Sequence, residues 1–293
     1  MSNSDPTLFP LSPLPPGPRA ASFGSLKRPL WSHQKARLIA HYLQLFTYVT
    51  KHGAYIDGFA GPQAPEEPGS WSAELVLGSE PRRLRTIHLC DESEAQIGHL
   101  RDLLGRQPPT PGRKIDLHVG DFNVVIDRIL ASGTIKPAQA TFALLDQRTF
   151  ECRWETVRKL AAHKPPGAYK IELFYFLPMV WFDRAVDALT RDKNRTLRGW
   201  WGRDDWLNYK NARSAQRPQI MTDRFRTELG YAFAHYWKIH SRDDGGRLMY
   251  VMIHASDHPE APKLMYRAYQ KATLGVERAK QLSLLTMMGF NGP

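Results

Sequence analysis

The sequence predicts an α/β fold in which a doubly wound, mostly parallel sheet is covered by helices on both faces. Short apolar segments alternate with longer amphipathic ones between residues 54 and 176, as in strands joined by crossover helices. The apolar segments contain few polar residues, which is typical of parallel strands buried on both faces. After Leu177, two further apolar segments flank Asp243-Asp244-Gly245-Gly246, and this turn sequence indicates a C-terminal antiparallel hairpin.

The first predicted helix runs from Trp31 to Val49, because Ser32 is a suitable N-cap and apolar residues then recur at helical spacing. A short strand from Ala54 to Ile56 follows and leads into Asp57. The later strands are expected at Leu84–Cys90, Ile115–Val119, Ala140–Leu145 and Lys170–Phe176, with helices between them at Ser93–Leu104, Val124–Leu130 and Trp154–His163.

The two ends of the chain carry different signals. Residues 1–29 hold seven prolines together with Ser and Gly, so we expect a disordered arm there. In the C-terminal part, helices are expected at Phe182–Leu189, Met221–Ala234 and Pro259–Thr273, and the strands of the hairpin at Tyr236–Ile239 and Arg247–Ala255.

Composition narrows the class of protein. The chain has 293 residues, 42% of them apolar, which is enough for one large or two modest domains. No apolar run reaches transmembrane length and no signal peptide is visible, so we expect a cytoplasmic protein. Cys90 and Cys152 lack a C-x-x-C spacing, which argues against a disulfide framework and against a metal site. The net charge of +11 favours nucleic acid as a partner, with a generic basic surface as the alternative.

The segment Tyr55-Ile56-Asp57-Gly58-Phe59-Ala60-Gly61-Pro62 is typical of a strand that ends in a tight, glycine-containing turn. Ligands of open α/β sheets bind where the strands end. The phosphate-binding patterns G-x-G-x-x-G and G-x-x-x-x-G-K-[ST] are both absent from the sequence. An acid among small residues fits S-adenosylmethionine better than a polyphosphate. An ordinary strand-to-loop turn is the alternative interpretation.

Four predicted strands end in an acid or have one just after their end: Asp57, Asp91, Asp121 and Asp146. Because like charges at one sheet edge repel, a ligand with several hydrogen-bond donors would relieve them. In a methyltransferase site, Asp91 would accept hydrogen bonds from the ribose hydroxyls. Asp121 would face the adenine amino group, with Phe122 against the ring. Taken singly, each acid could instead cap a turn or a helix.

Taken together, these motifs resemble those of the three-Cys-motif partner proteins, which are bacterial proteins with a methyltransferase-like fold. The resemblance covers about Trp31 to Thr273 and rests on five motifs: Trp31…Lys35…Tyr42-Leu43, Tyr55–Pro62, Glu67-Pro68-Gly69-Ser70, Gly120-Asp121-Phe122-Asn123 and Phe142-Ala143-Leu144-Leu145-Asp146. It implies a Rossmann-like S-adenosylmethionine domain and a partner that resembles radical enzymes with three clustered cysteines. The residues it implies for the cofactor are Asp57, Gly58, Phe59, Ala60, Gly61, Ser70, Asp91, Asp121 and Phe122.

With this resemblance, the chain divides into four expected parts. Residues 1–29 form the arm, and residues 30–185 form the methyltransferase-like cofactor domain. Residues 186–235 form a basic, aromatic-rich helical insertion, and residues 236–293 supply the hairpin and helix that complete the sheet.

The loop after the fourth strand departs from its relatives. Adenine methyltransferases carry Asp-Pro-Pro-Tyr or Asn-Pro-Pro-Tyr there, and many partner proteins carry Asp-Pro-Phe-Gly. This chain has Asp146-Gln147-Arg148 instead. We expect these three side chains to converge on the acceptor: Asp146 could accept from an amine, Gln147 could read a base edge, and Arg148 suits a phosphate or carboxylate. Phe150 or Trp154 could stack on a base. Alternatively, the loop has lost catalysis and kept the fold.

Glu172 interrupts an otherwise apolar strand, and a buried carboxylate needs a partner. Lys170 or Arg148 could neutralise it. Arg148 could also pair with Glu151, so the sequence leaves open whether Arg148 has a structural role or recognises the acceptor.

The segment from Arg191 to Arg213 interleaves aromatic residues with cations, as nucleic-acid-binding surfaces do. The alternative is a helical unit with tryptophans in its core. The predicted contacts are Lys35, Trp200, Trp201, Arg203, Lys210 and Arg213. The leading hypothesis is therefore methyl transfer from S-adenosylmethionine to nucleic acid. The alternatives are a nucleic-acid-binding adaptor for the three-Cys-motif protein and a small-molecule methyltransferase.

Overall fold

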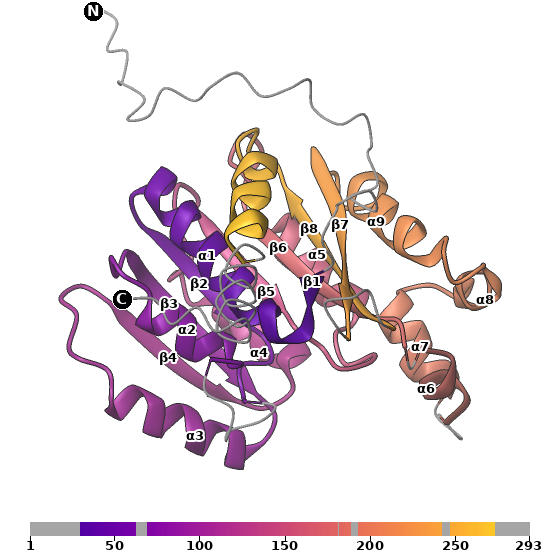
Figure 1. The fold of residues 1–293 in the computed structure, drawn as a ribbon, viewed down its shortest axis with the longest axis horizontal. Coiled ribbons are helices and arrows are strands. Elements are labelled where there is room, and N and C mark those ends of the chain that lie inside the picture. Colours follow the sequence, from indigo (N-terminus) through magenta and orange to yellow (C-terminus); the bar gives the residue numbers. More distant parts are fainter. Residues whose placement is uncertain (1–29, 63–68, 181, 189–192, 242–246, 273–293) are drawn as a thin grey trace, which may run out of the picture.

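The computed structural model describes residues 30–62, 69–180, 182–188, 193–241 and 247–272. The predicted arm, Glu67-Pro68 and the hairpin loop lie outside these residues. The described chain forms one sheet with helices packed against both of its faces (Figure 1).

The sheet has eight strands in the order β1-β7-β8-β6-β5-β2-β3-β4. Five neighbouring strands are parallel to one another: β2 (Gly53–Asp57), β3 (Leu84–Asp91), β4 (Lys114–Val119), β5 (Thr141–Leu145) and β6 (Glu172–Pro178). The remaining strands are β7 (Phe233–His240), β8 (Leu248–Ser256) and the short β1 (Leu30–Trp31). Strand β8 runs antiparallel to both β6 and β7. The predicted α/β class, with a mostly parallel sheet and a C-terminal hairpin, is therefore confirmed.

Two hydrophobic cores lie on opposite faces of the sheet. Ala54 and Ile56 belong to one core and Tyr55 to the other, because successive side chains of a strand point to opposite faces. The first core contains residues of α4 (Phe122–Ala131), α5 (Trp154–Ala162), α6 (Phe182–Ala188), α7 (Lys193–Trp201), α8 (Trp206–Asn211) and α9 (Arg217–Thr227). The second contains residues of α1 (Ser32–Thr50), α2 (Ser72–Gly78), α3 (Glu94–Gly105) and the helical residues 261–272.

The structure differs from the predicted elements in several places, including Trp31, which was expected in the first helix but lies in β1. The helix predicted to reach Ala234 ends at Thr227, and Phe233 and Ala234 belong to β7. Gly230 has a φ of +68°, the left-handed conformation with which a glycine commonly terminates a helix. Helix α2 was not predicted; it has only 7 residues, and its N-cap residue makes no side-chain cap hydrogen bond. None of the described helices has both the length and the apolar character needed to cross a membrane.

Candidate functional site

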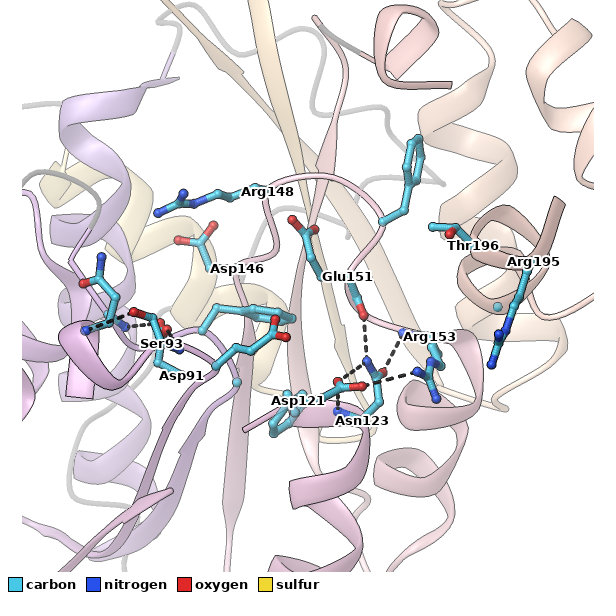
Figure 2. A pocket seen from close by; sticks show the side chains of 18 residues that line it. Asp91, Ser93, Asp121, Asn123, Asp146, Arg148, Glu151, Arg153, Arg195 and Thr196 are labelled. Carbon is cyan, nitrogen blue, oxygen red and sulfur yellow. Dashed lines mark hydrogen bonds and ion pairs between the residues drawn. The ribbon is translucent and has the colours of Figure 1, made fainter. Parts of the chain in front are cut away.

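A cavity of about 930 Å³ opens at the carboxyl edge of the parallel strands (Figure 2). Asp57 and Asp91 are the last residues of β2 and β3, while Asp121 and Asp146 follow β4 and β5 within two residues. The topology therefore brings the four predicted acids to one edge. The predicted residues that line the cavity are Gly58, Phe59, Gly61, Asp91, Asp121, Phe122, Asp146 and Arg148.

Several lining residues were not predicted as site residues: Glu92, Ser93, Gln96, Asn123, Glu151, Arg153, Arg195, Thr196 and Gly199. Most of them lie within a few residues of a predicted acid, so the strand-end rule could have found them. Arg195, Thr196 and Gly199 come from α7. No strand-end pattern marks them, because the packing of α7 beside α5 brings them to the cavity.

The Asp91 carboxylate is held by two backbone N–H groups. Gly61 donates to Oδ2 and Ser93 donates to Oδ1, each at 3.0 Å (Figure 2). A Cβ on residue 61 would lie 2.5 Å from Oδ2, so only glycine permits this approach. Each carboxylate oxygen keeps a further lone pair. Asp91 therefore retains acceptor capacity toward the cavity.

Gln96 supplies a second acceptor next to Asp91. It lies on α3 and lines the cavity. Its Oε1 is buried, and within the described part of the chain no donor reaches it. A buried amide oxygen without a donor is uncommon in native proteins, and a ligand hydroxyl or amino group would satisfy it.

Asp121 caps helix α4 and also lines the cavity. Its Oδ1 accepts from the backbone N of Asn123 at 2.8 Å and from Asn123 Nδ2 at 2.6 Å, and its Oδ2 lies 3.3 Å from Arg153 Nη2. The capping role that the sequence left open is thus present. Phe122, 3% exposed, places its ring near Phe59 with 5.9 Å between centroids. The two rings give this wall an apolar surface beside the acids.

Asn123 connects the start of α4 to the loop after β5. Its Nδ2 donates to the Glu151 carbonyl at 2.7 Å, and its Oδ1 accepts from the backbone N of Arg153 at 2.8 Å and from Thr156 Oγ1 at 2.6 Å. This one side chain therefore fixes the distance between the two elements that carry Asp121 and Asp146.

Three predicted cofactor residues lie outside the cavity lining. Asp57 is 1% exposed and accepts hydrogen bonds from the Tyr55 hydroxyl at 2.8 Å and from the Phe59 N–H at 3.1 Å. Burial raises the pKa of Asp57 to about 7. Ala60 is also buried, with its N–H bonded to the Cys90 carbonyl, and Ser70 is not among the lining residues. Asp57 and Ala60 therefore support the wall of the cavity from behind.

Lys35 does not lie on the surface, as a nucleic-acid contact would. It is 8% exposed, and its Nζ lies 2.6 Å and 2.7 Å from the two carboxylate oxygens of Asp146. The same Nζ lies 4.6 Å from the Phe176 ring centroid and 5.2 Å from that of Tyr250. Its position on α1 points it at the sheet edge, where it orients Asp146.

The three residues of the departing loop do not converge as expected. Asp146 and Arg148 line the cavity, whereas Gln147 is fully buried. The Gln147 Nε2 donates to the Phe176 carbonyl at 3.1 Å, and its Oε1 accepts from the Cys152 N–H at 3.0 Å. Both ends of this amide are therefore occupied by backbone, which leaves neither for a base edge.

Arg148 has no ion pair within the described residues, and its side chain is exposed at the cavity (Figure 2). The carboxylates proposed as its structural partners are occupied elsewhere. Glu172 is bonded to Tyr42, His254 and Ser256, and Glu151 accepts from Thr149. The geometry therefore favours the interpretation of Arg148 as a recognition residue.

The aromatic residues suggested for base stacking are core residues. Trp154, Trp200 and Trp201 are at most 3% exposed. Trp154 Nε1 donates to Glu228 at 3.0 Å. Phe150 is 5% exposed and touches the cavity, but its ring packs edge-on against Phe182 and Trp200. None of these rings presents an open face.

The cations of the same segment are mostly neutralised within it. Arg203 pairs with Asp205 and Glu228, and Lys210 pairs with Asp187 at 3.1 Å. Arg213 is exposed and has no ion pair among the residues that the structure describes. The predicted nucleic-acid surface at Trp200, Trp201, Arg203 and Lys210 is therefore not an array of free cations and aromatic faces.

No protein-family model and no curated protein matches the chain. Among solved structures, it is similar to the methyltransferase domain of bacterial CtHen1, with 13% identity, 76% of this chain and 99% of that chain covered, and a TM-score of 0.44. Human methyltransferase-like protein 13 in complex with SAH gives 11% identity, coverages of 83% and 92%, and a TM-score of 0.44. Protein LPL1258 from Legionella pneumophila shares 10% identity with this chain; the match covers 83% of this chain and 93% of that chain, with a TM-score of 0.44.

Proposed function

We propose that the chain is an S-adenosylmethionine-dependent methyltransferase whose cofactor binds in the cavity at the carboxyl edge of the sheet. The observation that carries this proposal is the row of acceptors in one wall, formed by Asp91, Gln96 and Asp121 beside the Phe122 ring. The cofactor offers matching donors, namely ribose hydroxyls and an adenine amino group. The cavity volume of about 930 Å³ lies in the range of small-molecule sites.

The donor chemistry assigns a part to each side chain. Asp91, held in place by Gly61 and Ser93, would accept from the ribose hydroxyls, and the unpartnered Gln96 oxygen would take a neighbouring donor. Asp121 would accept from the adenine amino group while Phe122 packs on the ring. When bound, the cofactor supplies a methyl group on a sulfonium, which is activated for transfer to a nucleophile.

The acceptor would enter beside Asp146. This carboxylate is fixed by Lys35 on one side, so its remaining lone pairs can orient an N–H or O–H group of the acceptor toward the methyl donor. Catalysis would then be mainly positioning. Arg148, a permanent cation at the cavity, suits a phosphate. Together with the net charge of +11, this supports nucleic acid as the acceptor.

Calorimetry with S-adenosylmethionine tests the cofactor assignment. We expect Asp91→Ala to weaken binding by about 1–3 kcal/mol, since it removes an acceptor for cofactor hydroxyls. Glu94→Ala is the matched control, because Glu94 lies near Asp91 in the chain but outside the lining. Equal affinity of the parent, Asp91→Ala and Glu94→Ala proteins for S-adenosylmethionine would show that the cofactor does not bind against this wall.

One observation favours a second candidate, a binding adaptor for a three-Cys-motif, radical-enzyme-like partner. The Gln147 amide is hydrogen-bonded to the backbone of Phe176 and Cys152. It lies in the loop with which an adenine methyltransferase would recognise its base. Cofactor binding without methyl transfer to any nucleic acid, together with capture of such a partner, would support the adaptor.

A further inference from the structure

A second hollow lies on the same edge of the sheet, next to the cavity. It measures about 510 Å³ and is lined by Met179, Val180, Asp183, Arg184, Ser214, Arg247 and Leu248. It forms where β6 ends at Pro178 and where the antiparallel β8 begins at Leu248. In the sheet order, β5, β6 and β8 are neighbours. The hollow is therefore only about two strand spacings, roughly 10 Å, from the β5 end that carries Arg148.

The hollow presents two arginines to solvent. Arg184 and Arg247 are both exposed, and neither has an ion pair among the described residues. Its one acid, Asp183, is already neutralised, because Arg217 binds both of its carboxylate oxygens at 3.0 Å and 3.1 Å. The Ser214 hydroxyl adds a neutral hydrogen-bonding group.

By contrast, most cations of the surrounding helices are paired with acids. The paired cations are Arg198, Arg203, Lys210, Arg217, Arg224 and Arg226. The arginines that lack an ion pair among the described residues include Arg148 and Arg195 at the cavity, Arg184 and Arg247 in the hollow, and Arg213 beside Ser214. Exposed arginines without carboxylates are suited to phosphate groups.

Tyr250 has neighbours that belong to the cavity and to the hollow. It lies on β8 opposite Pro178, two residues after Leu248 of the hollow, and its ring centroid lies 5.2 Å from the Nζ of Lys35, which pairs with Asp146 of the cavity. Arg148 is close enough to affect the pKa of the Tyr250 hydroxyl, which burial raises to about 12. Arg148 of the cavity and Leu248 of the hollow therefore both lie near Tyr250.

We propose that the hollow binds the sugar-phosphate backbone of a single-stranded nucleic acid, with Arg184 and Arg247 as the phosphate contacts, beside the nucleotide that enters the cavity. This inference rests on the proposed function for the identity of the acceptor. A nucleotide must leave any stack to reach a recessed cavity, which favours single strands. The proposed interface therefore lies at the sheet edge, and not on α7 and α8, where the sequence predicted it and where most cations are paired.

The experiment is fluorescence anisotropy with labelled single-stranded RNA and DNA of about 20 nucleotides, measured over a salt series. Arg184→Ala/Arg247→Ala should lower the salt slope by roughly 1.4, since each lost phosphate contact on a single strand is worth about 0.7. Arg198→Ala/Arg203→Ala is the matched control, because it removes the same charge from ion-paired positions, and its slope should stay near that of the parent. Thermal melts establish that each variant is folded, and Arg184→Gln/Arg247→Gln replaces the alanine pair if that pair is unfolded.

Two results would overturn the proposal: no binding of either strand by the parent at low ionic strength, or an equal fall in slope in the test and control variants. Calorimetry with S-adenosylmethionine separates this inference from the proposed function, because the hollow lies outside the cofactor wall. Unchanged cofactor affinity in the Arg184/Arg247 variant is expected. If the slope falls as expected in the Arg184/Arg247 variant but the parent binds no cofactor, the hollow is a nucleic-acid site and the proposed methyltransferase function is wrong.

Discussion

At the scale of single residues, the site separates groups that face the cavity from groups that hold the wall. Asp91 and Asp146 line the cavity, and each is oriented by a partner from another element: the Gly61 N–H and the Lys35 ammonium, respectively. Asp57 lies behind them without a cationic partner among the described residues, bonded to Tyr55 and Phe59. Burial without a counter-charge is why its pKa is raised to about 7.

This raised pKa makes a prediction about stability. The pKa of Asp57 is about 7 in the folded protein and about 3.8 in the unfolded chain, so the folded state holds the proton more tightly. The contribution of protonated Asp57 to the unfolding free energy is therefore fully present below the unfolded pKa and is lost as pH rises through the folded pKa. Relative to Asp57→Asn, the parent should therefore lose about 1 kcal/mol of unfolding free energy between about pH 6 and pH 8.

The measurement is chemical denaturation of both proteins at each pH. The difference between the two proteins is needed, because burial lowers the pKa of His41, His88 and His235 to about 4. These histidines make the folded state less stable as pH falls through their unfolded value, and they do so equally in both proteins. A difference between parent and variant that does not change with pH would contradict the assignment for Asp57.

At the scale of elements, the geometry of the site depends on how α4 and the loop after β5 are joined. Asn123→Ala would leave the Glu151 carbonyl, the Arg153 N–H and the Thr156 hydroxyl without their shared partner. We expect a loss of about 2–3 kcal/mol in unfolding free energy and weaker cofactor binding. Val124→Ala, on the same helix but 57% exposed, should change stability by less than about 0.5 kcal/mol. Equal melting temperatures for the two variants would show that the link carries no energy.

The elements also show what sequence alone could and could not predict. Strand ends and their acids were predictable, because a short apolar run that stops at Asp57 or Asp91 marks both a buried strand and its end. Gln147 was not, since the pattern of the loop is the same whether the amide points to a base or to the Phe176 carbonyl. The helix ending at Thr227 was extended too far because Gly230 was not taken as its stop.

At the scale of the whole molecule, the helices between β6 and β7 share a core with the rest of the first face. Trp200 packs edge-on against Phe150, and Phe225 packs edge-on against Trp154 and Tyr175. The aromatic content of this segment was predictable, but its burial was not, because interleaved tryptophans and arginines look alike on a surface and in a core. Arg224 illustrates this, as its guanidinium lies 3.9 Å from the ring centroids of both Trp154 and Trp201.

A shared core predicts one cooperative unfolding transition. Four of the eight tryptophans, Trp154, Trp200, Trp201 and Trp206, lie in this core. Tryptophan fluorescence, to which these four contribute, and far-ultraviolet circular dichroism, which reports on all helices, should give coincident denaturation curves. Two separated transitions, with fluorescence changing first, would show instead that α7 to α9 unfold as an independent unit.

The strand order has a consequence for how the chain is made. Strand β8 follows β7 in the sequence yet lies between β6 and β7, so on the ribosome β6 must wait for residues 248–256 before its outer edge is paired. Until then that edge exposes unpaired backbone groups, which is the state in which strands join foreign chains. A nascent chain paused just before β8 would thus present the apolar edge Leu173–Leu177. Codons translated slowly at that point would favour aggregation over folding.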